Sequence, residues 1–540
     1  MRRIQLFFLS VISGILLSLP WIFPALSWVL FFAFIPLLLA DNQRYQRNES
    51  GNFTSFFLLG FITFLIWNVL STWWIAYVSF VGMLFITSLN SLYMTIVWWL
   101  KNKVHEKLGA FSGYFSFVVF WTSFEFLNHH GLLPWPWLTL GNGFANSVKI
   151  IQWYEFTGVL GGSVWILSSN ILIFLIIKGL SGNPFRKFAK LVSISLLVIA
   201  FPIALSLYIY SNYSEKGVIQ NVVVLQPNID PYTEKFSGMS PDEQIKRLVS
   251  LTESKISDST DLVLAPETAL PPFWEDSIVI QNPSLIRFST IIQKFPNISF
   301  IAGAITQRKF RNDEPVSKAA RRSDDGKFSF DVYNSAVMIE RTGRVQISHK
   351  NILVAGVEND PFRGYFSFLP DYLLELGGTN GSLTSGKEPK VFELSGGKKI
   401  GPVICFESVF GEHTRQLVRN GANYIAVLTN DGWWKASPGA WQHFGYSKIR
   451  AIETRRSVVR SANTGISGFI NQRGDVLVQS NVNVSESISS GVRMNRTFTF
   501  YVRYGNYLGW ISLLLSGMIV VYLNSTSEIK GHKKSALIRL

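Results

Sequence analysis

Cysteine and charge are both scarce in this chain of 540 residues. Only one cysteine is present, Cys405, so the chain cannot form an internal disulfide or a zinc site built from cysteines. Charged residues make up 16% of the sequence, whereas soluble domains carry about 25%, and 48% of the residues are hydrophobic. The composition therefore excludes both a wholly soluble protein and an intrinsically disordered one.

The sequence contains several long apolar runs with few charged residues. A run of about 17 to 25 residues can cross a bilayer as a helix. The first run follows Met1-Arg2-Arg3 in the manner of a signal peptide, but further runs follow at once, so we interpret it as an uncleaved membrane segment. We expect eight transmembrane helices, at 4–20, 22–40, 54–75, 80–100, 109–128, 152–177, 191–210 and 507–524.

The basic residues predict how these helices are oriented. The net charge of +15 arises from 50 Lys and Arg against 35 Asp and Glu. Outside the polar stretch 211–506, nearly all basic residues lie at the termini or in alternate loops, and only Lys149 lies on the other side. Because loops rich in Lys and Arg stay cytoplasmic, we expect both termini inside and 211–506 outside, in a periplasm-like space. No basic stripe interleaved with aromatic residues is present, so nucleic-acid binding is not expected.

The polar stretch 211–506 has the pattern of a large α/β domain. Short β-branched apolar runs, such as 222–225 and 424–428, alternate with helix-like polar stretches, such as 241–256. Strands that alternate with helices predict a layered α/β architecture. We therefore expect three parts: transmembrane helices in 1–210, an extracytoplasmic α/β domain in 211–506, and an eighth transmembrane helix with a basic cytoplasmic tail in 507–540.

Three strand ends in this domain carry reactive side chains. Glu267 follows an apolar run and a proline, Lys350 follows His349, and Cys405 ends the run Gly401-Pro-Val-Ile. Ligands of α/β folds bind at the carboxyl ends of strands. A lone buried cysteine is usually inert, but here Glu267 would act as its general base and Lys350 would stabilise a tetrahedral oxyanion. The order and local sequence of the three residues together predict a Glu–Lys–Cys catalytic site.

The sequence around these residues is specific, and it carries a family resemblance. The motifs are Pro266-Glu267-Thr268-Ala269, His349-Lys350-Asn351, Cys405-Phe406-Glu407, Asn430-Asp431-Gly432-Trp433-Trp434, Gln442-His443, Arg450-Ala451-Ile452-Glu453 and Asn463-Thr464-Gly465-Ile466-Ser467. With them the chain resembles the nitrilase, or carbon–nitrogen hydrolase, superfamily, whose members use a Glu–Lys–Cys triad on an αββα sandwich. With its membrane spans it is similar over its whole length to the apolipoprotein N-acyltransferases. The resemblance implies a multi-pass α-helical membrane domain of about eight spans and an extracytoplasmic nitrilase-like αββα sandwich.

The resemblance also implies supporting residues. The family has an acidic residue eight positions after the lysine and another two positions after the cysteine, which correspond to Glu358 and Glu407. Phe406 stands where the family commonly has tyrosine, and the run Leu353–Glu358 departs from the usual family sequence. Phe236 stands where a tryptophan is common. We expect a lid or substrate contact at Phe236, Trp274, Phe362, Tyr365, Trp433 and Trp434.

For the reaction, the resemblance implies acyl transfer at the bacterial inner membrane. Cys405 would take the sn-1 acyl chain of a phospholipid as a thioester and release a lysophospholipid. The free amine of a diacylglyceryl-modified cysteine at an apolipoprotein N-terminus would then accept the chain. The partners are thus a phospholipid acyl donor, a diacylglyceryl apolipoprotein acceptor and membrane lipid. No cofactor is expected, and no metal either, since His129-His130 lacks further ligand spacing.

Two other functions remain open at this point. A membrane-anchored amidase, or another carbon–nitrogen hydrolase that uses water as acceptor, would share the same triad. A transporter or receptor with an outer ligand-binding domain would need charged or broken helices along a path, and the spans show few intramembrane charges and no repeated halves. The eight spans and the apolar lid segments favour lipid acyl transfer.

Overall fold

The computed structural model describes residues 3–46, 53–131, 133–179, 185–235, 238–277, 283–295, 298–311, 313–359 and 383–537. The chain divides into two compact units, which we describe separately. The first comprises Met1–Trp73, Met83–Ile209 and Asn506–Leu540, and the second comprises Trp74–Gly82 and Tyr210–Gly505. The second unit thus includes a short segment from between two membrane helices, which the sequence did not place there.

The first unit is helical. Eight stretches in the described part of the chain are long and apolar enough to cross a membrane, and each overlaps one of the expected spans. The prediction of about eight spans is therefore confirmed. The helices are α1 (Arg3–Ile22), α2 (Ile35–Gln46), α3 (Phe53–Thr72), α4 (Phe80–Leu108), α5 (Ala110–Asn128), α6 (Tyr154–Thr157), α7 (Val159–Gly179), α8 (Phe185–Asn212) and α15 (Tyr507–Leu537), with short 3-10 helices at Pro24–Phe31, Pro136–Leu138, Leu140–Phe144 and Val148–Ile150.

Two spans are interrupted where the sequence predicted continuous helices. The second begins as the 3-10 helix Pro24–Phe31, and α2 starts only at Ile35. Pro24 stands in the first turn of that 3-10 helix, where its missing N–H costs nothing. The sixth is broken at Gly158, whose φ of 63° ends α6 just before α7 starts. Glycine adopts this left-handed conformation without the penalty that a Cβ imposes.

A buried ion pair joins α2 to α4. Lys101 of α4 contacts Asp41 of α2, and both side chains are buried. The Lys101 Nζ also donates to the side-chain oxygen of Asn102 at 2.9 Å and lies 4.4 Å from the centre of the Trp98 ring. A charge among apolar helices is tolerated when it is paired and hydrogen-bonded, so this contact ties the two helices together.

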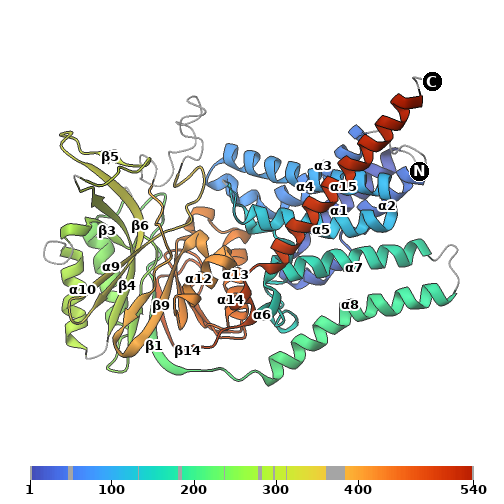
Figure 1. Ribbon diagram of the computed structural model, residues 1–540. Coiled ribbons are helices and arrows are strands. Elements are labelled where there is room, and N and C mark those ends of the chain that lie inside the picture. Colours follow the sequence, from blue (N-terminus) through green and yellow to red (C-terminus); the bar gives the residue numbers. More distant parts are fainter. Residues whose placement is uncertain are drawn as a thin grey trace. The chain divides into compact units, whose positions relative to one another are not determined.

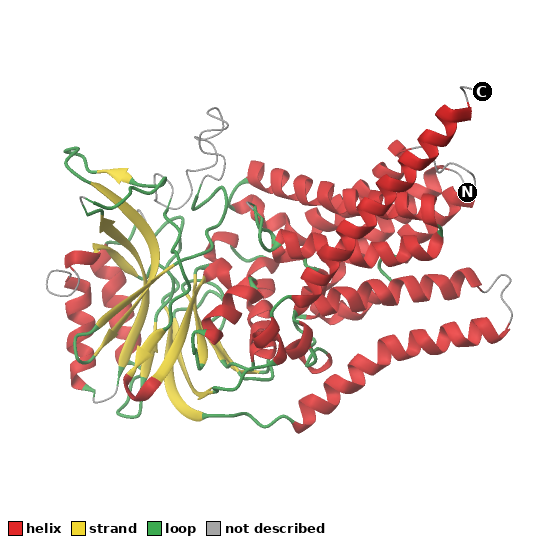
Figure 2. Ribbon diagram, in the orientation of Figure 1, coloured by secondary structure: helices red, strands yellow, loops and turns green. Residues whose placement is uncertain are grey.

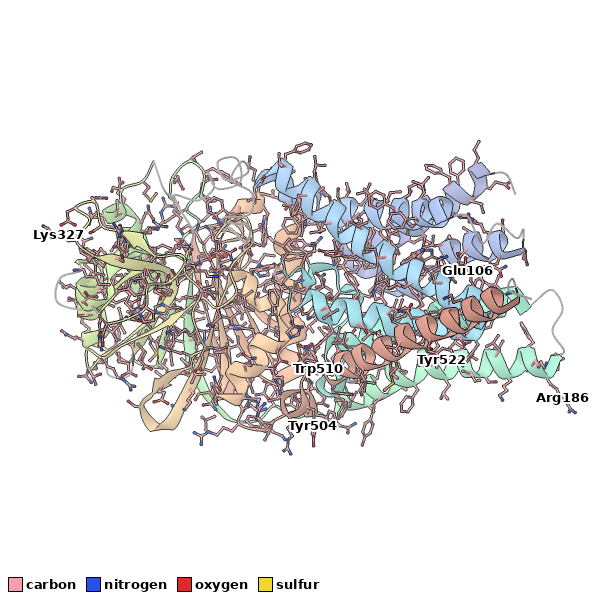
Figure 3. The ribbon with its side chains drawn as sticks, turned by 45° about the horizontal axis from the view of Figure 1, so that its top comes forward. Glu106, Arg186, Lys327, Tyr504, Trp510 and Tyr522 are labelled. Carbon is pink, nitrogen blue, oxygen red and sulfur yellow. The ribbon has the colours of Figure 1, made fainter. Side chains whose placement is uncertain are left out.

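Aromatic side chains mark both ends of the apolar part of α15. Trp510 lies near its start, where its ring centre is 4.8 Å from that of Phe126 in α5, and Tyr522 lies further along the same helix (Figure 3). Both rings are more than half exposed. Tryptophan and tyrosine are typical of membrane interfaces. Figure 1 shows both ends of the chain at the same end of this unit as the start of α8.

In its described residues, the second unit is built on two β-sheets. One has eight strands, in the order β14 (Glu486–Met494), β1 (Val218–Gln226), β2 (Leu262–Leu264), β4 (Ser299–Lys309), β6 (Ser329–Glu340) and β5 (Arg321–Arg322), with β3 (Leu270–Trp274) paired to β4 and β7 (Val345–His349) paired to β6. The other has six, in the order β13 (Val476–Gln479), β12 (Gly468–Ile470), β11 (Val458–Ala462), β10 (Tyr424–Thr429), β9 (Lys398–Ile404) and β8 (Phe392–Leu394).

Helices cover the outer faces of these sheets. Figures 1 and 2 show α9 (Pro241–Glu253) and α10 (Pro283–Lys294) on one side of the strands and α12 (Gly411–Arg419) and α13 (Pro438–Thr454) on the other. A short helix, α14 (Phe500–Tyr504), follows near the end of the unit. The layers run helix, sheet, sheet, helix, as the predicted αββα sandwich requires.

The alternation of side chains along the strands explains these layers. In β1, Val222 and Val224 pack into the core between the sheets, while Val223 and Leu225 pack beneath α9 and α10. In the second sheet, Ala426 of β10 faces the same central core, and its neighbours pack beneath α12 and α13. Because successive side chains of a strand point to opposite faces, a continuous apolar strand is what a sheet covered on both faces needs.

The buried ion pair gives a prediction for the helical unit. Replacement of Lys101 by methionine leaves the Asp41 carboxylate buried without its cation, so we expect a loss of about 3–5 kcal/mol in the free energy of unfolding. Lys103→Met is the matched control, because the exposed Lys103–Glu106 pair at 3.1 Å contributes at most about 1 kcal/mol. Denaturant unfolding in detergent measures both. Equal losses in the two variants would contradict the role assigned to the buried pair.

Candidate active site

The three reactive residues predicted from the sequence lie just beyond strand ends of both sheets. Glu267 follows β2, Lys350 directly follows β7, and Cys405 directly follows β9. Two turns here are strained, since Cys405 has a φ of 51° and Thr268, next to Glu267, has a φ of 50°. Residues with a side chain adopt this left-handed conformation at a cost of about 1–3 kcal/mol and keep it only where surrounding contacts impose it.

An ammonium group and two carboxylates form the centre of the site. The Lys350 Nζ lies 2.8 Å from Glu358 Oε1 and 3.3 Å from Glu267 Oε1. The side-chain amide of Asn334 donates to the same two oxygens, at 3.0 Å and 2.8 Å respectively. Glu358 is further fixed by the backbone N–H of Val354 at 2.8 Å. The structure therefore brings Glu358 to the lysine, as the family resemblance implied, and adds Asn334.

Asn334 was not predicted from the sequence. It lies in β6, whose run from Val332 to Ile339 is otherwise mostly apolar and fully buried. An amide in a buried strand needs partners for its hydrogen-bonding groups. That mismatch between residue type and strand pattern is the feature that would have identified it.

Burial and nearby charges together shift the pKa values of Lys350 and Cys405. Burial alone would lower the pKa of Lys350, but the charges of Glu358 and Glu267 outweigh it and raise this pKa above its usual value. Burial raises the pKa of the Cys405 thiol, and the charge of Glu267 raises it further, while Lys350 acts in the opposite direction. The raised pKa values favour the ammonium form of Lys350 and the neutral thiol form of Cys405.

Glu407 connects the lysine segment to the cysteine segment. Its Oε1 accepts the backbone N–H groups of Asn351 at 2.6 Å and Ile352 at 3.2 Å, and its Oε2 accepts that of Ile404 at 2.8 Å. Burial would raise the pKa of this carboxyl, but His413, the Ile404 N–H and the charge of Lys350 outweigh it and lower the pKa, so Glu407 stays ionised. One buried carboxylate thus fixes the residues next to Lys350 and Cys405 against each other.

A second network holds the backbone of the cysteine turn. The Nε2 of His443 lies 3.1 Å from the carbonyl oxygen of Cys405 and 2.7 Å from the hydroxyl oxygen of Ser408. Its Nδ1 lies 2.9 Å from Asp431 Oδ1, and Arg460 pairs with the other oxygen of Asp431 at 2.7 Å. Burial and the charge of Arg460 lower the pKa of His443, which keeps the imidazole neutral. The sequence showed His443 and Asp431 as parts of family motifs but assigned them no role.

Lys235 is a further buried cation that the sequence did not single out. Its Nζ donates to the backbone carbonyl of Glu267 at 3.1 Å, and only 8% of the residue is exposed. Burial lowers the pKa of Lys235 to about 8 against the opposing charge of Glu267. From the sequence it belongs to an ordinary polar turn, and only its contact with Glu267 shows that it lies at the site.

The predicted aromatic contacts have different surroundings. Phe406 is buried and packs edge-on against Phe410. Trp274 packs against Phe328 and Phe330, with ring centres 5.8 Å and 5.1 Å away, and Lys309 lies over its ring. The expected contact residues Phe236, Phe362 and Tyr365 lie outside the described residues, as does most of the apolar segment after Glu358.

Trp433 and Trp434 are half-buried and point to different neighbours. The Trp433 ring lies 5.4 Å from Tyr232, and the Trp434 ring lies 4.7 Å from Trp74 and 5.4 Å from His443.

In the described part of the chain, no cluster of three or more His, Cys, Asp or Glu side chains is arranged to hold a metal ion. The described residues of the site provide the thiol of Cys405, the carboxylates of Glu267 and Glu358 and the ammonium group of Lys350.

The opposing charges on the thiol give a first prediction. Glu267→Gln removes the charge that raises the pKa of Cys405, so we expect faster alkylation of Cys405 by iodoacetamide at pH 8. Each unit by which the pKa falls raises the thiolate fraction about tenfold. Glu393→Gln, which removes an exposed charge on β8, serves as the control. Slower alkylation of the Glu267 variant, with the control unchanged, would contradict the electrostatic effect of Glu267.

A second prediction concerns His349, next to Lys350. Burial and the charges of Lys390 and Arg308 lower its pKa to about 4, and its ring stacks on Tyr333 with centres 3.9 Å apart. In the unfolded chain this histidine has a pKa of about 6.5. The stability that the protein gains by keeping His349 neutral is therefore complete above pH 6.5 and is lost as the pH falls toward 4.

The loss attributable to His349 should reach about 3 kcal/mol at the acid end of this range. We expect the melting temperature of the wild-type protein to fall more steeply between pH 6.5 and pH 4 than that of His349→Gln. Thermal melts at a series of pH values provide the comparison. Parallel curves for the two proteins would show that the histidine does not titrate in this way.

Comparison with known proteins assigns both units. The N-terminal domain of the apolipoprotein N-acyltransferases matches residues 13–172, and the carbon–nitrogen hydrolase family matches residues 222–496, slightly more than half of the chain. Among solved structures, a Saccharomyces cerevisiae member of the nitrilase superfamily covers 52% of this chain and 93% of its own, at 15% identity and a TM-score of 0.36.

Curated relatives match nearly the full length. The apolipoprotein N-acyltransferase of Chlorobaculum tepidum is 28% identical, over 95% of this chain and 96% of its own. Those of Geobacter metallireducens and Thermotoga maritima are 27% and 26% identical, over 93% and 100% of this chain and 92% and 97% of their own. The chain therefore belongs to the carbon–nitrogen hydrolase family, as its Glu–Lys–Cys motifs predicted.

Proposed function

We propose that this acyltransferase moves an acyl chain from a phospholipid to the free α-amine of a diacylglyceryl-modified cysteine at the N-terminus of an apolipoprotein. The observation that carries the proposal is the buried Lys350 ammonium group, which Glu267 and Glu358 hold and whose charge acts on Cys405. The described part of the chain also has eight helical stretches long and apolar enough to span a membrane. Full-length similarity to named apolipoprotein N-acyltransferases supports the same substrates.

In the first half-reaction, Cys405 Sγ attacks the carbonyl carbon of the sn-1 ester. Glu267 takes the thiol proton, which is needed because the buried thiol is neutral at rest. Lys350 stabilises the negative charge on the carbonyl oxygen, because Glu358 and Glu267 hold its ammonium group in place. The C–O bond then breaks, and the leaving glycerol oxygen takes the proton from Glu267. The products are a lysophospholipid and an acyl thioester on Cys405.

In the second half-reaction, the neutral α-amine of the apolipoprotein attacks the thioester carbonyl. Glu267 takes the proton that the amine loses, and the same Lys350 ammonium group stabilises the second oxyanion. The C–S bond breaks, and Cys405 recovers its proton from Glu267. The balance is one ester and one amine consumed, and one amide and one alcohol formed. Exclusion of water from the thioester is what separates this reaction from hydrolysis.

We further infer that residues 211–506 face the periplasm and that 1–210 and 507–540 supply the membrane helices. The segment Trp74–Gly82 and residues 210–505 share one unit, and four candidate spans separate them, an even number that returns the chain to the same side. Basic residues gather at the start of α8, where Figure 3 labels Arg186, and in the C-terminal part of α15. Positive residues on the cytoplasmic side support this orientation.

The function is tested on the purified full-length protein in phospholipid nanodiscs. We expect intact-protein mass spectrometry to show one fatty acyl group on Cys405, because the thioester is an isolable intermediate when no amine is present. Addition of a synthetic diacylglyceryl-cysteine peptide with a free α-amine should remove that mass and yield an N-acylated peptide. Cys405→Ala should lose both steps and keep its fold.

The matched control is the same peptide with an acetylated α-amine, which cannot accept the chain. Release of free fatty acid at equal rates with either peptide, and no N-acylated product, would show that water is the acceptor. The protein would then be a membrane-anchored hydrolase. Normal peptide acylation by Cys405→Ala would exclude the sulfur as nucleophile.

A further inference from the structure

The segment that joins the end of the third candidate span to the start of the fourth belongs to the second unit. Residues Trp74–Gly82 group with Tyr210–Gly505 and not with the helices that flank them in sequence. Trp74 is 1% exposed, and its ring contacts Trp434 and Gly439 of the same unit. The segment therefore has structural partners among residues that also surround the active site.

Its first partner is the turn that follows Asp431. The Trp74 ring lies 4.7 Å from the Trp434 ring, centre to centre, and it also packs against Gly439 at the start of α13. A Cβ on Gly439 would lie 2.8 Å from the Trp74 ring, so glycine is needed there for the close approach. Trp434 in turn lies edge-on to His443, whose Nε2 is 3.1 Å from the carbonyl oxygen of Cys405.

Its second partner is the turn Asp230–Lys235. The Tyr232 hydroxyl lies 3.1 Å from the carbonyl oxygen of Tyr77 and 2.8 Å from that of Trp433, so it bridges the two segments. The Lys435 ammonium group lies 5.1 Å from the Tyr77 ring centre and 5.4 Å from that of Tyr232. Cation–aromatic contacts at these distances are attractive.

This second turn is held by hydrogen bonds of its own, and its last residue contacts Glu267. The Asp230 side chain accepts the backbone N–H groups of Tyr232 at 2.8 Å and Thr233 at 2.9 Å, and its carbonyl accepts that of Lys235 at 2.9 Å. At the far end of the turn, the Lys235 Nζ donates to the carbonyl of Glu267. Displacement of Tyr232 would therefore displace the backbone that carries Glu267.

Both contact chains end on backbone carbonyls beside strained residues. One ends on the carbonyl of Cys405, whose own φ is 51°, and the other ends on the carbonyl of Glu267, which precedes Thr268 with a φ of 50°. Such turns relax when their supporting contacts are lost. A small displacement of a reacting group is enough to slow a reaction strongly.

We propose that Trp74–Gly82 is a positioning element of the active site, which holds the Trp433–Lys435 turn and the Asp230–Lys235 turn and through them orients Cys405 and Glu267. The proposal rests on the proposed function only in taking Cys405 and Glu267 as the reacting groups. The segment that joins the third candidate span to the fourth thus affects the reaction rate, although none of its residues needs to touch substrate.

Trp74→Ala, Gly439→Ala and Tyr232→Phe perturb this element in three independent ways. The first removes the ring, the second pushes on it from α13, and the third removes only the bridging hydroxyl. Gly439→Ala is also expected to fold, because alanine is a better helix former than glycine. Trp28→Ala and Tyr504→Phe are the matched controls, because both side chains are exposed and lie outside this element.

The measurement is the single-turnover rate of Cys405 acylation at varied phospholipid concentration, together with the rate of Cys405 alkylation by iodoacetamide. We expect the maximal acylation rate to fall about tenfold or more in Trp74→Ala and Gly439→Ala, and less in Tyr232→Phe, with little change in half-saturating phospholipid. The alkylation rate should change in the same three variants, and Trp74→Phe should restore part of the loss. Melting temperatures identify any variant that fails to fold.

Wild-type acylation rates in folded Gly439→Ala and Tyr232→Phe would overturn the proposal, and so would a loss seen only as weaker phospholipid saturation. If Trp74→Ala fails to fold, these two variants decide the question. A wild-type protein that forms no acyl-enzyme would refute the proposed function instead, and the alkylation rates would still test the positioning element.

Discussion

The Glu407 carboxylate is the contact on which the active site most depends. Lys350 extends from one sheet and Cys405 from the other, and the packing of two apolar sheets does not by itself fix two strand ends at atomic precision. Glu407 accepts backbone N–H groups from Asn351, Ile352 and Ile404. Three charge-assisted hydrogen bonds to one buried ion form a rigid connection, and breaking them would leave a charge without partners in the interior.

The charges and the burial around Cys405 favour its neutral thiol form. Glu267 and Glu358 stabilise the Lys350 cation, and the same Glu267 charge opposes ionisation of Cys405. A permanently ionised Cys405 would compete with Glu267 for the positive charge of Lys350. In the proposed reaction, a neutral thiol instead gives its proton to Glu267 as the new bond forms, when the charge moves to an oxygen that Lys350 can stabilise. This arrangement is consistent with the proposed reaction, in which the thioester must persist until the amine arrives.

The two strained turns show how the rest of the unit supports this chemistry. Cys405 and Thr268 both adopt left-handed backbone angles, and each turn is held through a carbonyl, by His443 and by Lys235 respectively. His443 is neutral and fully buried against Asp431 and Arg460, which makes it a fixed part of the scaffold. Supports of this kind lie far apart in the sequence, so they form only when both sheets and their helices have packed.

The sequence by itself determined the eight spans, the layered α/β class and the family, because apolar run lengths, strand alternation and short motifs are local properties. The αββα sandwich followed from the family resemblance. It also predicted Glu267, Lys350 and Cys405, and through the family Glu358 and Glu407. It did not predict the breaks at Pro24 and Gly158, or the roles of Asn334, Lys235 and His443. It also placed Trp74–Gly82 among the membrane helices. Only the tertiary structure decided these points, because each depends on partners from distant segments, and hydrogen bonding and packing across such distances leave no periodic pattern in the chain.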